Sequence, residues 1–218
     1  MGHDRRVRFD AIGDFDPYGG APPPGSLTAH LLVATPRLAD PNFARRTVLV
    51  LDHGDHGALG VVLDAPGGVP VREVLPQWDL LALPPAELFT GGPVARDALV
   101  GLARLRSGVV REGEPATVPP DGWHPLIDDR CPVGTIDLGA GPDRWDGDLL
   151  GVRLFSGYAG WGPGQLEDEI DEGSWFVVRA EAHDVVSAEP ERLWRRVLHR
   201  QGGALALVSG FPDDPAFN

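Results

Sequence analysis

The chain has 218 residues, 42% of them apolar, and a formal net charge of −13 with every one of its 19 basic residues an arginine. This composition suits one globular domain with a sizeable core and argues against a disordered chain. The acidic balance argues against direct nucleic-acid binding, because affinity for DNA comes largely from neutralised phosphates, and the sequence has no apolar run long enough to cross a bilayer.

The first 25 residues lack periodicity and end in a glycine- and proline-rich run, so we expect a disordered or loosely attached tail followed by one domain over residues 26–218. Arg5 and Arg6 are not followed by an apolar segment, which argues against a twin-arginine export signal. The single cysteine, Cys131, excludes an internal disulfide and fits a reducing compartment. We therefore expect the protein in the cytoplasm and expect no membrane association.

Apolar, β-branched runs separated by turn residues predict a β-rich core. The predicted strands are residues 27–34, 47–51, 59–63, 88–90, 98–105, 123–126 and 133–138. The other predicted segments are a hairpin loop over 52–57, one or two helical turns within 69–75, a packed loop over 78–86 and a mobile loop over 107–122.

Residues 152–178 predict a strand, a glycine turn, a short acidic helix and a second strand, with the turn running from Gly157 to Gly164. Leu166 and Ile170 are four residues apart and share one helical face. A phosphate-binding loop is disfavoured, because no G-x-G-x-x-G motif fits and the acidic helix would repel a phosphate. The favoured interpretation is a tight corner that docks a small helix onto a sheet.

A second helix is predicted over residues 190–201, with Ser187 as its candidate N-cap. Leucine, tryptophan and valine form its apolar stripe, and four arginines are expected to point largely the other way. Those arginines, at positions 192, 195, 196 and 200, form either a solvated face or a site for the acidic helix of a second copy. The apolar residues 204–208 are expected to be buried.

Catalytic signatures are incomplete: G-x-S-x-G, H-E-x-x-H and Walker motifs do not occur. His53 and His56, together with Asp52 and Asp55, suggest metal ligands, but turn-forming residues in a solvated loop explain the same pattern. Cys131 could pair with His183 as nucleophile and base, although a lone inert cysteine is commoner. No metal and no cofactor is expected.

Three blocks resemble the YqgE/AlgH family and follow its order across most of the chain. They are A-T-P-R-L-A-D-P-N-F-A-R-R-T-V-L-V-L-D-H with G-A-L-G-V-V-L-D inside residues 34–64, L-F-T-G-G-P-V at 88–94, and G-Y-A-G-W-G-P-G-Q-L-E-D-E-I-D-E-G-S-W at 157–175. The resemblance implies an α/β (α+β) fold: a single compact domain with a strongly bent mixed β-sheet core and a few short flanking helices. The family is largely uncharacterised, and one branch is named as a regulator of transcription.

The resemblance and the incomplete catalytic set favour a non-catalytic protein that binds a protein or small-molecule partner, with a regulatory role that does not involve direct DNA contact. The sequence leaves open whether the protein forms a homo-oligomer. The alternative is a hydrolase or metal-assisted enzyme that uses Asp40, Asp52 and His53. Residues that match family motifs would form a functional surface if they converge; otherwise they hold turns and core corners together. These residues are Asp40, Asn42, His53, Gly92, Tyr158, Trp161 and Gln165.

Overall fold

The computed structural model of the protein describes residues 17–18, 25–106, 122–127, 132–145 and 147–211. Most of the predicted tail, residues 107–121 of the loop predicted over 107–122, and Cys131 lie outside these ranges. Within the predicted tail, the Pro17 carbonyl accepts a hydrogen bond of 2.7 Å from the Val177 amide, and Tyr18 packs against a buried cluster of the domain. A membrane-spanning helix is not found among the described residues.

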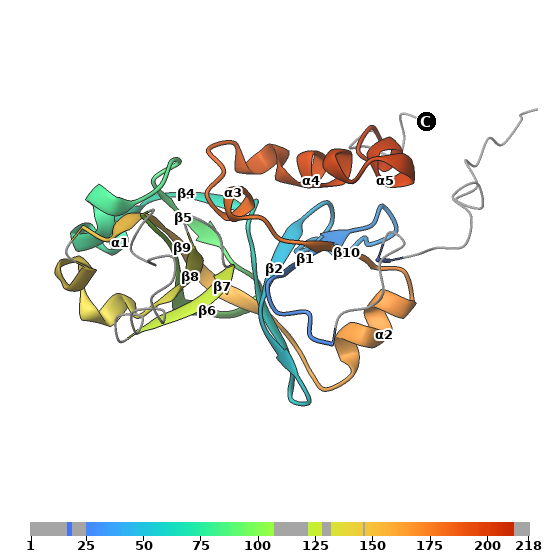
Figure 1. Cartoon of the computed structure of the whole chain (residues 1–218), viewed down its shortest axis with the longest axis horizontal. Helices are drawn as coiled ribbons and strands as arrows, with labels where there is room; N and C mark the ends of the chain where they lie inside the picture. Colours follow the sequence, from blue (N-terminus) through green and yellow to red (C-terminus); the bar gives the residue numbers. More distant parts are fainter. Residues whose placement is uncertain (1–16, 19–24, 107–121, 128–131, 146, 212–218) are drawn as a thin grey trace, which may run out of the picture.

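The described part of the chain forms one sheet with short helices around it (Figure 1). The strands are β1 (His30–Ala34), β2 (Thr47–Gly54), β3 (Gly57–Val62), β4 (Pro66–Pro70), β5 (Glu87–Thr90), β6 (Val94–Leu105), β7 (Trp123–Ile127), β8 (Val133–Ile136), β9 (Leu149–Trp161) and β10 (Trp175–Arg179). The α-helices are α1 (Val71–Val74), α2 (Gln165–Asp171), α3 (Ala182–Val185), α4 (Leu193–Gln201) and α5 (Gly203–Val208). The 3₁₀ segments are η2 (Pro76–Leu81), η3 (Leu138–Ala140), η4 (Pro142–Trp145) and η5 (Pro190–Arg192).

Strand β9 is a central strand of the sheet. The main strand order is β10-β1-β2-β3-β9-β6-β8-β7. The C-terminal end of β9 pairs with β3, and most of its length pairs antiparallel with β6. It also pairs in parallel with β5, which makes the sheet mixed, and β4 continues from β5. Strands β4 to β9 curl into a half-barrel beside the flatter β1, β2 and β10 (Figure 1). The predicted mixed, strongly bent sheet in one α+β domain is confirmed.

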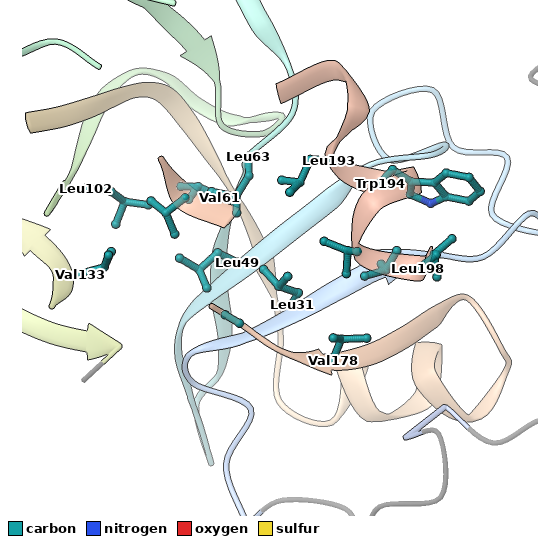
Figure 2. Close-up of a cluster of buried hydrophobic side chains, with 14 of the residues drawn as sticks. Leu31, Leu49, Val61, Leu63, Leu102, Val133, Val178, Leu193, Trp194 and Leu198 are labelled. Carbon is teal, nitrogen blue, oxygen red and sulfur yellow. The ribbon is translucent and has the colours of Figure 1, made fainter. Parts of the chain in front are cut away.

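The flatter part of the sheet is buried on both faces. Leu31, Leu49 and Val178 pack with helix α4 on one face, and Figure 2 shows these side chains close to Leu193 and Leu198. Residues one position along the same strands pack with helix α2 on the other face. Since side chains of a strand alternate between faces, double-sided burial explains why these strands read as continuous apolar runs.

The curled part of the sheet has its own core. Trp78, Trp123 and Trp145 are buried there with apolar side chains of β6 and β9. Trp78 lies in η2, where a packed loop was predicted, and its indole donates a hydrogen bond to the Leu138 carbonyl at 3.2 Å. The proline-interrupted segment therefore serves as a wall of the half-barrel.

Several predicted features differ in the structure. Asp52 and His53 belong to strand β2, because the hairpin turns on Asp55 and His56 alone. Gly157 lies inside β9: its φ of 71° accommodates a register shift against β6, so the glycine turn begins only at Gly162. Residues 203–208 form helix α5, of which only Val208 is buried, because Gly202 ends α4 and the chain turns back along it.

The C-terminal helix is confirmed, but it begins as the 3₁₀ segment η5 and continues as α4. Ser187 is not its N-cap; the Ser187 hydroxyl accepts a hydrogen bond of 3.2 Å from the Glu189 amide, before the helix. The arginine face is not simply solvated. Arg195 donates to the Ser209 carbonyl at 2.6 Å, and Arg200 forms a salt bridge with the buried Asp184 carboxylate.

Arg153 links β9 to the segment before α4, although it is 2% exposed. Its guanidinium donates hydrogen bonds to the carbonyls of Pro84, Val185 and Ser187 and lies 4.5 Å from the centre of the Phe89 ring. Burial lowers the pKa of Arg153 to about 10, so the group stays charged at neutral pH. Three carbonyls therefore solvate one buried cation.

Replacing this cation should destabilise the protein strongly. We expect Arg153→Met to lower the free energy of unfolding by about 3 kcal/mol, because three carbonyls lose a charged donor in a buried place. Urea unfolding of the wild type and the variant measures the loss. Arg192→Met is the matched control, because Arg192 is 75% exposed with one salt bridge to Glu189, and it should change stability by less than about 0.5 kcal/mol. Equal effects of the two substitutions would contradict the linking role of Arg153.

Candidate functional site

A cavity of about 200 Å³ lies where residues 41–46 meet the ends of strands β3 and β5. Among the described residues of its lining, Arg46 is the one that is ionisable, while Asn42 and Thr90 supply neutral polar groups. The remaining lining residues are Pro41, Val62, Ala65, Pro66 and Gly92. The cavity thus combines a cation and two hydrogen-bonding side chains with an apolar wall.

The loop that carries Asn42 is built by local hydrogen bonds. The Asp40 side chain accepts from the Asn42 backbone amide at 2.8 Å and from the Asn42 side-chain amide at 3.0 Å, as in an Asx turn. Phe43 anchors the loop, since its ring stacks on Trp161 and meets Trp175 edge-on. Asn42 is therefore held at the cavity by a turn on one side and an aromatic contact on the other.

The opposite wall depends on a close approach between backbones. A Cβ atom at Gly92 would lie 2.2 Å from the carbonyl carbon of Tyr158, so only glycine fits against β9 at this position. The Gly91 amide donates to the Ser156 carbonyl, and the Gly91 carbonyl accepts from the Val62 amide, each at 2.8 Å. These bonds bring the Gly-Gly-Pro turn to the end of β3 and form the wall that carries Thr90.

A buried carboxyl group lies directly after β3, beside the cavity. Asp64 is 1% exposed, and its side chain accepts a hydrogen bond of 3.2 Å from the Thr47 amide. The Arg46 guanidinium donates to the Asp64 backbone carbonyl at 2.6 Å. Burial raises the pKa of Asp64 to about 7, although hydrogen bonding from Thr47 and the charge of Arg46 oppose the rise. Asp64 therefore changes its charge near neutral pH.

The acidic helix α2 is docked through one carboxylate. One Glu169 oxygen accepts hydrogen bonds from the indoles of Trp161 and Trp175 at 2.9 Å and 2.8 Å, and the other accepts from the Gln165 side chain at 3.0 Å. The Gln165 side chain in turn accepts from the Gly162 amide at 3.0 Å. The corner between β9 and α2 is thus closed by polar side chains as well as by the buried Leu166 and Ile170, in agreement with the predicted docking of a small helix on the sheet.

His53 is a second link to α2. Its Nδ1 accepts a hydrogen bond of 3.1 Å from the Leu27 amide, and its Nε2 lies 2.7 Å from a Glu167 oxygen. Nδ1 is therefore unprotonated and Nε2 carries the hydrogen. A hydrogen bond from the Glu167 backbone, followed by the His53 contact, lowers the pKa of Glu167. Both ring nitrogens of His53 are engaged in holding strands and helix together.

The structure divides the seven predicted surface residues into two groups. Asp40 and Asn42 are joined by hydrogen bonds, Asn42 and Gly92 share the cavity, and Gly92 lies against the Tyr158 backbone. The other group, His53, Trp161 and Gln165, surrounds helix α2. The aromatic contacts of Phe43 connect the two groups.

Arg46, Asp64 and Thr90 are the site residues that the sequence analysis did not select. Each stands at the end of an apolar strand run inside a block that resembles the family, which is the one signal that could have indicated them. Among the described residues, no three histidine, cysteine or acidic side chains gather in a way that could hold a metal ion.

The comparisons with known proteins agree with this fold. A family model described as AlgH-like matches residues 31–206. A UPF0301 protein of Streptomyces avermitilis is 50% identical over 193 residues, covering 88% of this chain and 96% of that protein. A UPF0301 protein of Mycobacterium avium is 42% identical over 188 residues, covering 86% and 89%.

Two solved structures share the architecture. A crystal structure of a Corynebacterium diphtheriae protein aligns with a TM-score of 0.77 at 31% identity, covering 93% of this chain and 97% of that one. The solution structure of the AlgH protein from Pseudomonas aeruginosa aligns with a TM-score of 0.57 at 27% identity, covering 88% and 97%.

The buried Asp64 should make stability depend on pH. Its pKa in the folded state, about 7, lies above the ordinary value of 3.8, so the stability that its protonated form supports is present at low pH and is lost as pH rises through about 7. We expect Asp64→Asn to become more stable than the wild type between pH 5 and 8, by at most about 4 kcal/mol. Urea unfolding across that range measures the difference.

An exposed aspartate provides the control for this pH profile. Asp55→Asn, in the β2–β3 turn, should leave the profile of the wild type unchanged. A constant difference between Asp64→Asn and the wild type at every pH would show that Asp64 keeps its ordinary pKa.

Removing the carboxylate that joins the indoles should loosen helix α2. We expect Glu169→Ala to lower the free energy of unfolding by about 2 kcal/mol, because the indole donors of Trp161 and Trp175 lose their acceptor. Glu172→Ala, an exposed position at the end of the same helix, should cost much less. Equal losses, with no change in tryptophan fluorescence for Glu169→Ala, would contradict the role of Glu169.

Proposed function

The chain belongs to the AlgH-like family, and from that premise we propose that it is a non-catalytic cytoplasmic protein that binds a small molecule in the cavity beside Asn42, Arg46 and Thr90. We further propose that the bound molecule gives the protein a regulatory role. The observation that carries the proposal is the cavity itself, where polar groups from two separate segments, the loop of residues 41–46 and strand β5, converge on one small space.

Small-molecule sites are typically concave, mostly apolar and furnished with a few placed polar groups. The described cavity carries such placed polar groups, since one guanidinium, one amide and one hydroxyl group line it together with proline, valine and alanine side chains. Thr90 is exposed, and its hydroxyl has no hydrogen-bond partner within the described ranges, so it is available to a ligand.

The non-catalytic part of the proposal is supported by the contacts of the residues that the enzymatic alternative requires. The Asp40 carboxylate is engaged with Asn42, and both ring nitrogens of His53 are engaged with Leu27 and Glu167. A general base needs a free acceptor within reach of a nucleophile or a substrate. The His53 ring therefore has no free acceptor for this role in the described structure.

A regulatory role would run through a partner. The net charge of −13 opposes direct contact with DNA, because a duplex carries a dense line of phosphates. We propose that ligand binding changes the surface around the loop of residues 40–46, which a protein partner then recognises.

Filling the cavity tests the proposal. Thr90→Met should abolish ligand binding without unfolding the protein, because the longer side chain occupies the cavity from a strand position that is exposed. The measurement is a fragment screen by amide chemical-shift changes, with the amides of Asn42, Thr90 and Gly92 as reporters.

Thr135→Met is the matched control, because Thr135 is a partly buried threonine in strand β8 that does not line the cavity. It should keep the binding of the wild type. A screen that perturbs none of the three reporter amides in the wild type would remove the proposed function, and so would fragment binding that Thr90→Met leaves intact.

A further inference from the structure

We propose that the ligand of this cavity is a small aliphatic monocarboxylate, bound through its carboxylate by the Arg46 guanidinium with the Asn42 and Thr90 side chains. This inference rests on the proposed function and narrows it to one chemical class.

The charge of the lining selects an anion. Arg46 is the single ionisable residue among those that line the cavity, and its guanidinium is matched in shape to a carboxylate. One of its terminal nitrogens is bound to the Asp64 carbonyl at 2.6 Å, which fixes the orientation of the group. In the described part of the chain, no carboxylate oxygen bonds the Arg46 guanidinium, so its remaining N–H groups are open to a ligand.

The neutral polar groups suit the same ligand. The Asn42 side-chain amide uses one N–H on Asp40 and keeps a second for another acceptor. The Thr90 hydroxyl is a donor that can turn toward a carboxylate. An ammonium group would find no carboxylate among the lining residues, and a multiply charged phosphate would meet only one cation. The described lining therefore favours a ligand that carries one negative charge.

The size and the apolar wall set the rest of the molecule. The cavity has a volume of about 200 Å³, which suits a small molecule. Pro41, Val62, Ala65 and Pro66 offer the carbon chain apolar side chains to contact. An acid with a short carbon chain suits this space.

Asp64 couples this binding to protons. Within the described residues, Arg46 is the charged group that acts on the buried Asp64 carboxyl, and the Thr47 amide is its hydrogen-bond donor. A bound carboxylate would offset the charge of Arg46 and so favour the protonated form of Asp64. By linkage, ligand affinity should fall as pH rises through the pKa of Asp64, about 7.

Three molecules with four carbon atoms each test the assignment on the full-length protein: butyrate, its neutral isostere butyramide, and the cation butylammonium. We expect butyrate to shift the Asn42, Thr90 and Gly92 amides with an affinity at least tenfold higher than that of butyramide, and butylammonium to cause no shift at these amides. We also expect butyrate to bind severalfold more weakly at pH 8 than at pH 6 in the wild type but not in Asp64→Asn.

Arg46→Met should lose the preference for butyrate over butyramide, whereas Arg72→Met, an exposed arginine of helix α1 away from the lining, should keep it. If Arg46→Met does not fold, the comparison of the three molecules on the wild type decides alone. Equal or tighter binding of butyramide or butylammonium would overturn the carboxylate assignment and leave the proposed function standing. If neither these molecules nor a wider fragment set shifts the cavity amides, both the carboxylate assignment and the proposed function are overturned.

Discussion

The fold depends on covering both faces of the same strands. Strands β1, β2 and β10 place one set of side chains against α4 and the alternate set against α2, so neither helix can leave without exposing half of the sheet core. The helices are short, and most of the stability of short helices comes from packing rather than from helix propensity. A sheet that is dry on both sides offers no open face, and the cavity accordingly lies at the strand ends.

Strand β9 runs through both regions of the sheet and joins them. It contributes to the half-barrel core through Leu154 and to the helix-covered core through Trp161. The cavity lies next to this transition, between the loop held by Phe43 and the turn pressed against Tyr158. Its shape is fixed by backbone contacts and aromatic packing, while the groups that can meet a ligand are separate side chains. Structural and binding roles are thus divided among different residues.

Much of the fold could be predicted from local patterns, because apolar runs and glycine turns act over a few residues. The strands near 30–34 and 47–51, the helix over residues 165–171 and the docking of Ile170 follow from such patterns. Gly157 was predicted in a turn because it begins a run of closely spaced glycines. Its place inside β9 depends instead on pairing with β6, which is distant in the sequence. The exposure of α5 could not be predicted, because the local sequence does not show whether other elements pack against an apolar segment.

The candidate site was predicted only in part for the same reason. Asn42 and Gly92 were selected from motifs, and the structure brings them to one cavity. Arg46 and Asp64 were missed, because an arginine or aspartate next to a strand usually faces water, and only the pairing of β2 with β3 shows that this carboxyl is buried.

The contact between Pro17 and Val177 has a consequence for behaviour in concentrated solution. Strand β10 ends the sheet, and the outward amide of an end strand is a template on which another chain can add. Here the carbonyl of Pro17 occupies that amide, and proline itself offers no donor in return, so an approaching strand finds an interrupted ladder. The contact of Pro17 with β10 thereby hinders the addition of another strand at Val177.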